Sequence, residues 1–449
     1  MIARPTDTRF STTTPPARMA LGVALDHFAA HKPLVREALA DALQADPRCV
    51  SALVFDGFVQ ILLARSETIL AARDRYADAQ AALAHVSASP GERALLEALG
   101  FAVDGRLLKA AERLELRLET DPTDFLCLKL AHALQFLAGD EKGMLATTTR
   151  VLPNWTADAR YHGYVLGCHA FGLGEAGRLS EAEAFGRRAV EIAPDDAWGL
   201  HAVAHVYETR GLTGAGIVWL EKTRCVWEQC NNFAYHMAWH LALLQLERGA
   251  CAEAMATYDS HVRPTSTDDF RDIANATSML WRFTQLGFDV GDRWDELHAI
   301  ARRRADDTTL VFASLHHLLT SLACGDHQSA ARVTASLEKL ALTPASDQAE
   351  VAAFVGAPLA RALQSRNENN LMPLDLATIA RNLPMLGGSH AQRDVFLRTL
   401  ALIAAQSADK TTLHNVLKLR DSQRASDSIT RKSTLIHAAR HTLPHQQVA

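Results

Sequence analysis

Seven glycines recur along the chain at an almost constant interval. Neighbours are 34 or 38 residues apart, and the series runs Gly105, Gly139, Gly177, Gly211, Gly249, Gly287 and Gly325. Helical periodicity fills the intervals from about Met19 onward, and strand signals are almost absent. A repeat of this length with a glycine at the turn is typical of stacked helix–turn–helix units, since one hairpin cannot bury its apolar face alone. The sequence therefore predicts an all-α superhelix, or α-solenoid.

Each interval carries further punctuation. A small or apolar residue usually stands five positions after the glycine, as Ala110 and Ala182 do, and Asp292 is the exception. Pro122 and Pro194 follow twelve residues later in the two most regular units. We expect the glycine to end the first helix in a left-handed cap and the small residue to admit close helix packing. Proline then ends the second helix.

One unit resembles a known repeat. The stretch 177–194, GRLSEAEAFGRRAVEIAP, is similar to the second helix of a tetratricopeptide repeat. We therefore expect tetratricopeptide-like helical repeats over 18–343, with degenerate early units, after a disordered leader at 1–17. From Pro344 onward the phase is lost. Helices predicted at 346–366, 390–406, 410–421 and 426–441 would form a C-terminal helical cap over 344–449.

Composition excludes several classes of protein. The formal net charge is −5 and the isoelectric point about 6.5, which argues against nucleic acid as a partner, because phosphate binding needs a basic surface. No apolar run reaches the roughly 18 residues of a membrane helix, and the N-terminal residues lack a signal-peptide core. Seven cysteines without a Cys-x-x-Cys pattern indicate reduced thiols. We expect a soluble cytoplasmic protein without a membrane partner.

Histidines lie in an unusual pattern on two apolar helices. His201, His205 and Glu208 are spaced i, i+4 and i+7, so they share one stripe of the first helix. His236 and His240 are spaced i, i+4 on the next helix but one. A polar stripe where packing residues are expected makes these five residues the candidate catalytic group.

The tetratricopeptide resemblance also implies a register. With the turn glycine at position fifteen, positions two, five, nine and twelve of a unit face the concave groove. Four of the five candidates then occupy groove positions on neighbouring helices: His201, His205, Glu208 and His236. Lys129 takes the fifth position of an earlier unit. His240 and His316 fall at the sixth position, toward the seam between helices.

Three chemical interpretations stay open. Neutral imidazoles with a carboxylate suit zinc or iron, and the metal ligands would be His201, His205, His236 and His240. Alternatively, a histidine oriented by Glu208 could perform acid–base catalysis, since imidazole titrates near neutrality. The third interpretation is structural, with the histidines bridging semi-buried helices through hydrogen bonds.

Aromatic residues are concentrated in the same region. All seven tryptophans fall between Trp155 and Trp294, and ten of the twenty histidines fall between His162 and His317. This crowding predicts a lined pocket, with Trp198, Trp239 and His316 as candidate ligand-binding residues. The alternative is that the middle of a helical array is simply its most buried part.

A second candidate segment lies near the C-terminus, where residues 386–396 read LGGSHAQRDVF. Ser389 and Gln392 form a helix capping box, and a helix should therefore begin after Ser389. Capping does not explain the residues that follow. His390, Arg393 and Asp394 are further candidate ligand-binding residues if the C-terminal helices fold over the groove.

Several segments together resemble one family more closely. They are VLPNW at 151–155, YVLGCHAFGL at 164–173, DAWGLHAVAH at 196–205, Trp239–His240 and GSHAQRDVF at 388–396. In combination they are similar to the tetratricopeptide repeat protein 38 family, across about residues 20–410. The resemblance implies a soluble α-helical repeat protein. It implies no reaction, and no catalytic residues can be carried over from it.

Two functions follow as expectations. The first is a small-molecule enzyme with a central pocket rich in His, Glu and Trp, using metal-dependent or His/Glu acid–base chemistry. The second is a scaffold whose concave groove binds a peptide or protein. Peptide-binding grooves of this class usually offer Lys, Arg and Asn, whereas this groove offers His, Glu and Trp. The sequence therefore favours a small-molecule ligand.

Overall fold

The computed structural model describes residues 10–11, 14–343, 346–367, 375–406 and 410–425. All regular secondary structure in these ranges is helical, which confirms the predicted all-α class. Of the leader expected at 1–17, residues 1–9 and 12–13 lie outside the described part. Phe10 is buried, Ser11 Oγ donates to Glu92 Oε1 at 2.8 Å, and α1 already begins at Pro15. The helix expected at 426–441 also lies outside the described residues.

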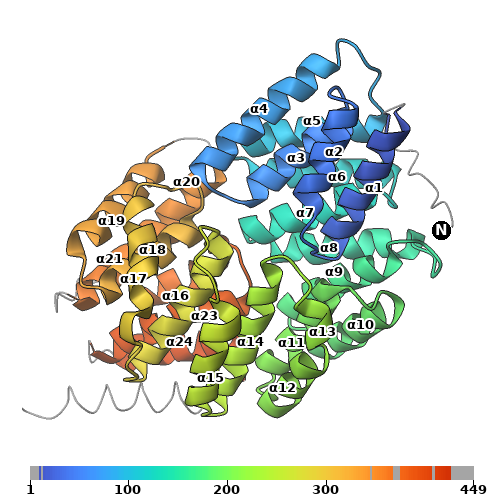
Figure 1. The fold of residues 1–449 in the computed structure, drawn as a ribbon. Helices are drawn as coiled ribbons and strands as arrows, with labels where there is room; N and C mark the ends of the chain where they lie inside the picture. Colours follow the sequence, from blue (N-terminus) through green and yellow to red (C-terminus); the bar gives the residue numbers. More distant parts are fainter. Residues whose placement is uncertain (1–9, 12–13, 344–345, 368–374, 407–409, 426–449) are drawn as a thin grey trace, which may run out of the picture. The chain divides into compact units, whose positions relative to one another are not determined.

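The chain divides into two compact units. Unit 1 holds residues 1–203, 223–234 and 345–347. Its helices form consecutive antiparallel pairs (Figure 1). The pairs are α1 (Pro15–Ala29) with α2 (Val35–Ala45), α3 (Val50–Leu62) with α4 (Ser66–Ala82), α5 (Pro90–Val103) with α6 (Leu107–Thr120), α7 (Phe125–Ala138) with α8 (Glu141–Val151), and α9 (His162–Glu175) with α10 (Leu179–Ile192). The short η1 (Leu152–Asn154) and α13 (Arg224–Trp227) also belong to this unit.

Unit 2 holds residues 204–222, 235–344 and 348–449. Helices α11 (Ala197–Thr209), α14 (Phe233–Glu247) and α20 (Asp347–Val351) cross the division. The other elements are α12 (Thr213–Lys222), α15 (Cys251–Thr257), η2 (Tyr258–Val262), α16 (Phe270–Gln285), η3 (Gly291–Arg293), α17 (Trp294–Arg303), α18 (Val311–Ala323), α19 (His327–Ala341), η4 (Ala352–Gly356), α21 (Ala357–Asn367), α22 (Leu376–Asn382), η5 (Leu383–Leu386), α23 (His390–Gln406) and α24 (Lys410–Gln423). Here α21 packs on α18 and α19, α23 packs on α16, and α24 packs on α23.

The predicted turns are confirmed at all seven glycines. Each has a φ between 67° and 87°, the left-handed region that glycine enters without steric cost. Gly139, for example, ends α7, and its N–H bonds to the Phe136 carbonyl. The small residues five positions later are also where close packing requires them: Ala110, Ala182 and Ala254 are completely buried. The repeat punctuation thus predicts where seven of the hairpins turn.

The predicted capping box before α23 is also confirmed. Gln392 N donates to Ser389 Oγ at 3.3 Å, and Ser389 N donates to Gln392 Oε1 at 2.9 Å. This reciprocal pair starts α23 at His390, so that the next turn of the helix carries Arg393 and Asp394. Across the described residues, no helix combines the length and apolarity needed to cross a bilayer.

Candidate functional site

The four histidines predicted as metal ligands are all buried, and each could offer one nitrogen to a metal ion. His201 and His205 lie one turn apart on α11, and His236 and His240 lie one turn apart on α14. Three of them, His205, His236 and His240, belong to unit 2, and within that unit one nitrogen from each lies within 4.8 Å of the others. We call these three the histidine cluster.

Inside the histidine cluster the rings meet edge to face. The His205 and His240 ring centroids are 4.6 Å apart, and those of His236 and His240 are 4.7 Å apart. Helical spacing explains this arrangement, since residues i and i+4 share one face. Two neighbouring helices therefore direct three imidazoles toward one point in unit 2.

Glu208 fixes the orientation of His240. Its Oε2 lies 2.8 Å from Nδ1 of His240, and both side chains are buried. Burial alone raises the pKa of Glu208, but the hydrogen bond and charge of His240 and the charge of Arg424 outweigh it and lower that pKa to about 2. An ionised carboxylate only accepts hydrogen bonds, so the proton of His240 resides on Nδ1. In the neutral form of His240 the lone pair is then on Nε2, the nitrogen that faces Nε2 of His236.

The His236 ring is oriented by a residue on a different helix. Nδ1 of His236 lies 3.1 Å from Oδ1 of Asn275 on α16, while its Nε2 lies 3.2 Å from Nε2 of His240. Burial, with the charge of His240, lowers the pKa of His236 well below its usual value. If Nδ1 donates to Asn275, both Nε2 lone pairs face each other across 3.2 Å. Such a contact is repulsive unless a proton or a cation lies between the nitrogens.

The donor set fits a transition-metal ion. Two nitrogens bound at about 2.0–2.1 Å to one tetrahedral zinc ion stand about 3.3–3.4 Å apart. The separation of 3.2 Å between Nε2 of His236 and Nε2 of His240 is close to that value. Carboxylate and amide oxygens also bond the far nitrogens of both rings, as is usual around metal-bound imidazoles.

A buried network of ion pairs stands behind Glu208. Arg424 bonds Glu208 Oε1 at 3.4 Å, forms a short ion pair with Glu247, and lies 3.6 Å from Asp394. Asp394 is bonded by Arg420 at 2.6 and 3.1 Å. Burial raises the pKa of Asp394, but Arg420 and Arg424 outweigh it and hold that pKa far below the usual range. Asp394 is therefore a shared counter-ion of Arg420, on α24, and of Arg424, which follows that helix.

The other candidates near α23 have structural partners. His390 borders a cavity of about 10 Å³ that Glu208 and Asp394 also line, which is room for about one water molecule. Arg393 donates to the backbone carbonyls of Gly387 and Gly388. The structure thus brings Asp394 and His390 near Glu208, whereas Arg393 serves the turn that precedes α23.

The remaining candidates of unit 2 separate into two groups. Trp239 stacks on His236 with ring centroids 5.2 Å apart, and its Nε1 donates to Ser278 Oγ at 2.9 Å. It is therefore a wall of the histidine cluster. His316 instead bonds the Phe312 carbonyl at 2.8 Å and packs against the Phe396 ring. These partners make His316 a core residue of α18.

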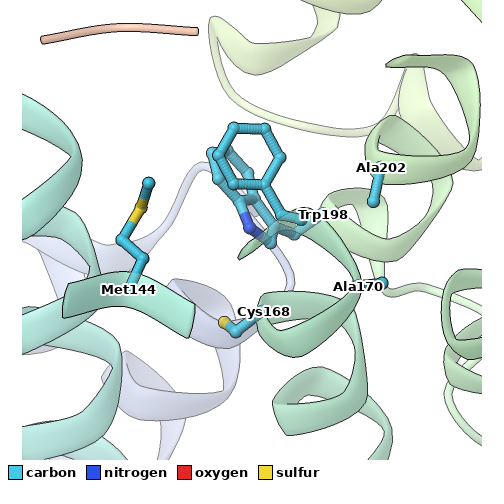
Figure 2. Close-up of a cluster of buried hydrophobic side chains, with 6 residues drawn as sticks. Met144, Cys168, Ala170, Trp198 and Ala202 are labelled. Atoms are coloured by element: carbon cyan, nitrogen blue, oxygen red, sulfur yellow. The ribbon is translucent and has the colours of Figure 1, made fainter. Parts of the chain in front are cut away.

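His201 and Trp198 lie in unit 1, at the start of α11. The His201 ring stacks on Phe171 with centroids 5.5 Å apart and lies 4.9 Å from the Trp198 ring. Trp198 Nε1 donates to Nε2 of His132 at 3.2 Å. Figure 2 shows Trp198 beside Cys168 and Met144 in a buried apolar cluster. His201 thus has aromatic partners within its own unit.

The sequence analysis missed the partners that complete the site. Asn275 and Arg282 lie on α16, and Arg420 and Arg424 lie on or just after α24. Arg282 is 2% exposed and lies 3.7 Å from Asp394. Asn275 and Arg282 are polar residues at helix positions where apolar ones are expected, and this pattern could have indicated them as site residues. No local pattern indicates that Arg424 reaches a carboxylate 216 residues earlier in the chain.

Comparison with known proteins adds little to this description. No protein-family model matches the sequence. Among solved structures, the chain is similar to one described as the structure of Naa15/Naa10 bound to HypK-THB, with 13% sequence identity and a TM-score of 0.25. The similarity covers 94% of this chain and 66% of that one, so the chain spans slightly less than two thirds of the structure it matches.

Proposed function

We propose that unit 2 binds a divalent transition-metal ion, with zinc the best fit, through His205, His236 and His240. The observation that carries the proposal is the separation of 3.2 Å between the Nε2 atoms of His236 and His240. The Glu208 and Asn275 oxygens lie at the far nitrogens of His240 and His236, so each ring turns the lone pair of its Nε2 toward the metal when its Nδ1 donates to that oxygen.

We further propose that this site is catalytic. Three protein ligands leave one position of a tetrahedral zinc ion for water or substrate, and the bound ion would supply Lewis-acid activation for hydrolysis. Glu208 keeps His240 in the tautomer that presents Nε2. The buried Trp239 ring excludes water from one side of His236. Burial of all these groups favours a small-molecule substrate over a peptide lying along a surface.

Acid–base catalysis is the second candidate, and Asn275 favours it. Nδ2 of Asn275 is buried without a hydrogen-bond partner. Turning this amide over would let Nδ2 donate to Nδ1 of His236, which then carries its proton on Nε2. The result is a continuous chain from Glu208 through His240 and His236 to Asn275. In this arrangement Nε2 of His240 accepts from His236, so His240, oriented by Glu208, would act as the general base once a substrate proton takes the place of that hydrogen bond.

Metal analysis of the full-length protein tests the first proposal. Protein stripped with a chelator should regain one equivalent of zinc and give the absorption spectrum of tetrahedral cobalt when titrated with Co²⁺. The variants His236→Ala and His240→Ala should lose stoichiometric binding. His327→Ala, an exposed histidine on α19, is the matched control and should bind normally. If the two cluster variants bind cobalt as the wild type does, the proposed metal site is wrong.

Asn275→Asp separates the two candidates. An aspartate oxygen still accepts from Nδ1 of His236, so cobalt affinity should stay within about threefold of the wild type, or rise, if a metal binds. In the acid–base arrangement Asn275 must donate, and aspartate has no proton to give. Two results together would support acid–base chemistry instead. The wild-type protein would bind no metal, and nitrogen-15 NMR spectra would show that Asn275→Asp breaks the hydrogen bond between His236 and His240.

A further inference from the structure

Lys129 is a buried cation without a carboxylate partner. It lies on α7 at 5% exposure, in the groove register noted from the sequence. Its Nζ is 3.5 Å from Nε2 of His31, 3.9 Å from Sγ of Cys168, and 5.4 Å from the Trp198 ring centroid. Among the described residues no carboxylate lies within 4.0 Å of it. A buried charge in such surroundings is costly unless an anion compensates it.

Lys129 acts through its charge on the Asp196 carboxylate but forms no ion pair with it. Asp196 is completely buried at the start of α11, and neither oxygen has a hydrogen-bond partner of ordinary geometry. Burial raises the pKa of Asp196 to about 7, despite the charge of Lys129 and nearby backbone N–H groups. Its Oδ2 lies against α9, where a Cβ added to Gly167 would come within 2.1 Å. The carboxylate therefore lies in the α9–α11 contact, beyond ion-pair distance of Lys129.

Aromatic rings form a wall beside Lys129. His31 stacks on Phe233 with centroids 4.5 Å apart and on Trp198 with centroids 5.5 Å apart. His31 has a φ of 55°, which a non-glycine residue adopts only at an energetic cost, and its carbonyl accepts from Asn231 N at 2.8 Å. His31 and Phe233 are half-buried, while Trp198 and Cys168 belong to the cluster in Figure 2. The wall thus combines two half-buried rings with one ring of the buried cluster.

We propose that Lys129 and this wall, formed by His31, Trp198 and Phe233, bind a small organic carboxylate. The ammonium of Lys129 pairs with the carboxylate, and the rings cover the apolar body of the ligand. One lysine matches one carboxylate charge, whereas phosphate sites usually use several cations or a row of backbone N–H groups. The site lies wholly in unit 1, so it does not depend on the metal proposed for unit 2.

Calorimetric titration of the full-length protein tests this site with three probes that share one ring. Benzoate should bind saturably with one site per chain. Benzyl alcohol, which lacks the charge, should bind at least tenfold more weakly, and benzylamine should not bind. Saturable binding of benzylamine in place of benzoate would identify Asp196 as the binding group and overturn the proposal. Absence of saturable benzoate binding would overturn it as well.

Two lysine variants test whether Lys129 is the residue that binds benzoate. Lys129→Met keeps the length of the side chain and should weaken benzoate binding at least tenfold, while Lys142→Met, at an exposed lysine of α8, should leave it unchanged. Benzoate affinity that Lys129→Met does not alter contradicts the proposal. If circular dichroism shows that Lys129→Met does not fold, Phe233→Leu provides the second test. It should weaken benzoate severalfold, and unchanged affinity there would also overturn the site.

Discussion

Oε2 of Glu208 lies 2.8 Å from Nδ1 of His240, and neither side chain is accessible to solvent. The two residues are 32 positions apart, on α11 and α14. Because the carboxylate accepts, the imidazole must present Nε2 to the histidine cluster. The same hydrogen bond would orient His240 in either a metal site or an acid–base pair. Glu208→Gln tests how much it contributes.

Glu208→Gln should weaken metal binding without abolishing it. The glutamine oxygen can still accept from His240, but the negative charge that makes the ring a better ligand is lost. Loss of an outer-shell partner typically lowers metal affinity about 10–100-fold, and a competitive cobalt titration would detect this change. Glu253→Gln, an exposed glutamate of α15, is the control. Equal affinities in both variants would mean that Glu208 does not act on the metal.

Asp394→Asn should destabilise unit 2. It removes the buried carboxylate paired with Arg420, whereas Arg424 keeps its ion pairs with Glu208 and Glu247. The loss should cost about 3–5 kcal/mol in the free energy of unfolding. Urea denaturation at pH 7 measures this cost, with the exposed Asp292→Asn as control.

The pH dependence of this effect has a defined sign. Because folding depresses the pKa of Asp394, its stabilising contribution is complete above the unfolded pKa of about 4 and declines as pH falls toward the folded pKa. The difference between wild type and Asp394→Asn should therefore shrink below about pH 4. A difference that grows on acidification would contradict this role of Asp394.

Asp196→Asn should change the pH dependence of stability in the opposite sense. Folding raises the pKa of Asp196 to about 7 through burial, so the unfolded chain loses this proton first. The stability that the protonated group contributes is complete below about pH 4. It is lost as pH rises to about 7, by as much as ~4 kcal/mol. Asparagine is close to aspartate in size and does not ionise. The stability lost between pH 5 and pH 8, measured by thermal unfolding at both values, should therefore be smaller for Asp196→Asn than for the wild type or the control Asp195→Asn.

Gly249→Ala and Gly214→Ala should have opposite effects on stability. A Cβ at either position meets no atom within 4 Å, so sterics with neighbours are equal. Gly249 has a φ of 87° between α14 and α15, where alanine should cost about 1–2 kcal/mol. Gly214 lies in the first turn of α12, where alanine should stabilise by up to about 1 kcal/mol. Denaturant titration measures both, and destabilisation by both variants would indicate that φ is not the cause.

Local signals in the sequence were sufficient for much of the fold. The glycines from Gly105 to Gly325 predict seven turns of the repeats, because a left-handed cap depends mainly on the residue that adopts it. The earlier turns at His31 and Ala64 also have a positive φ but carry no glycine, so this spacing does not predict them. Ser389 and Gln392 predict the start of α23 for the same reason, since both partners of the capping box lie within one turn. The positions of His205 and Glu208 on one stripe also follow from helical periodicity alone.

Tertiary structure decided which of these side chains meet and what each one binds. His236 and His240 share a stripe, but only packing of α11 and α16 against α14 brings Glu208 and Asn275 to their far nitrogens. His316 occupies the same repeat position as His240, yet its neighbours on α18 and α23 make it a core residue. Periodicity determines the direction of a side chain from its own helix. Its hydrogen-bond partners and its degree of burial depend on helices distant in sequence, so they are set only when the units fold.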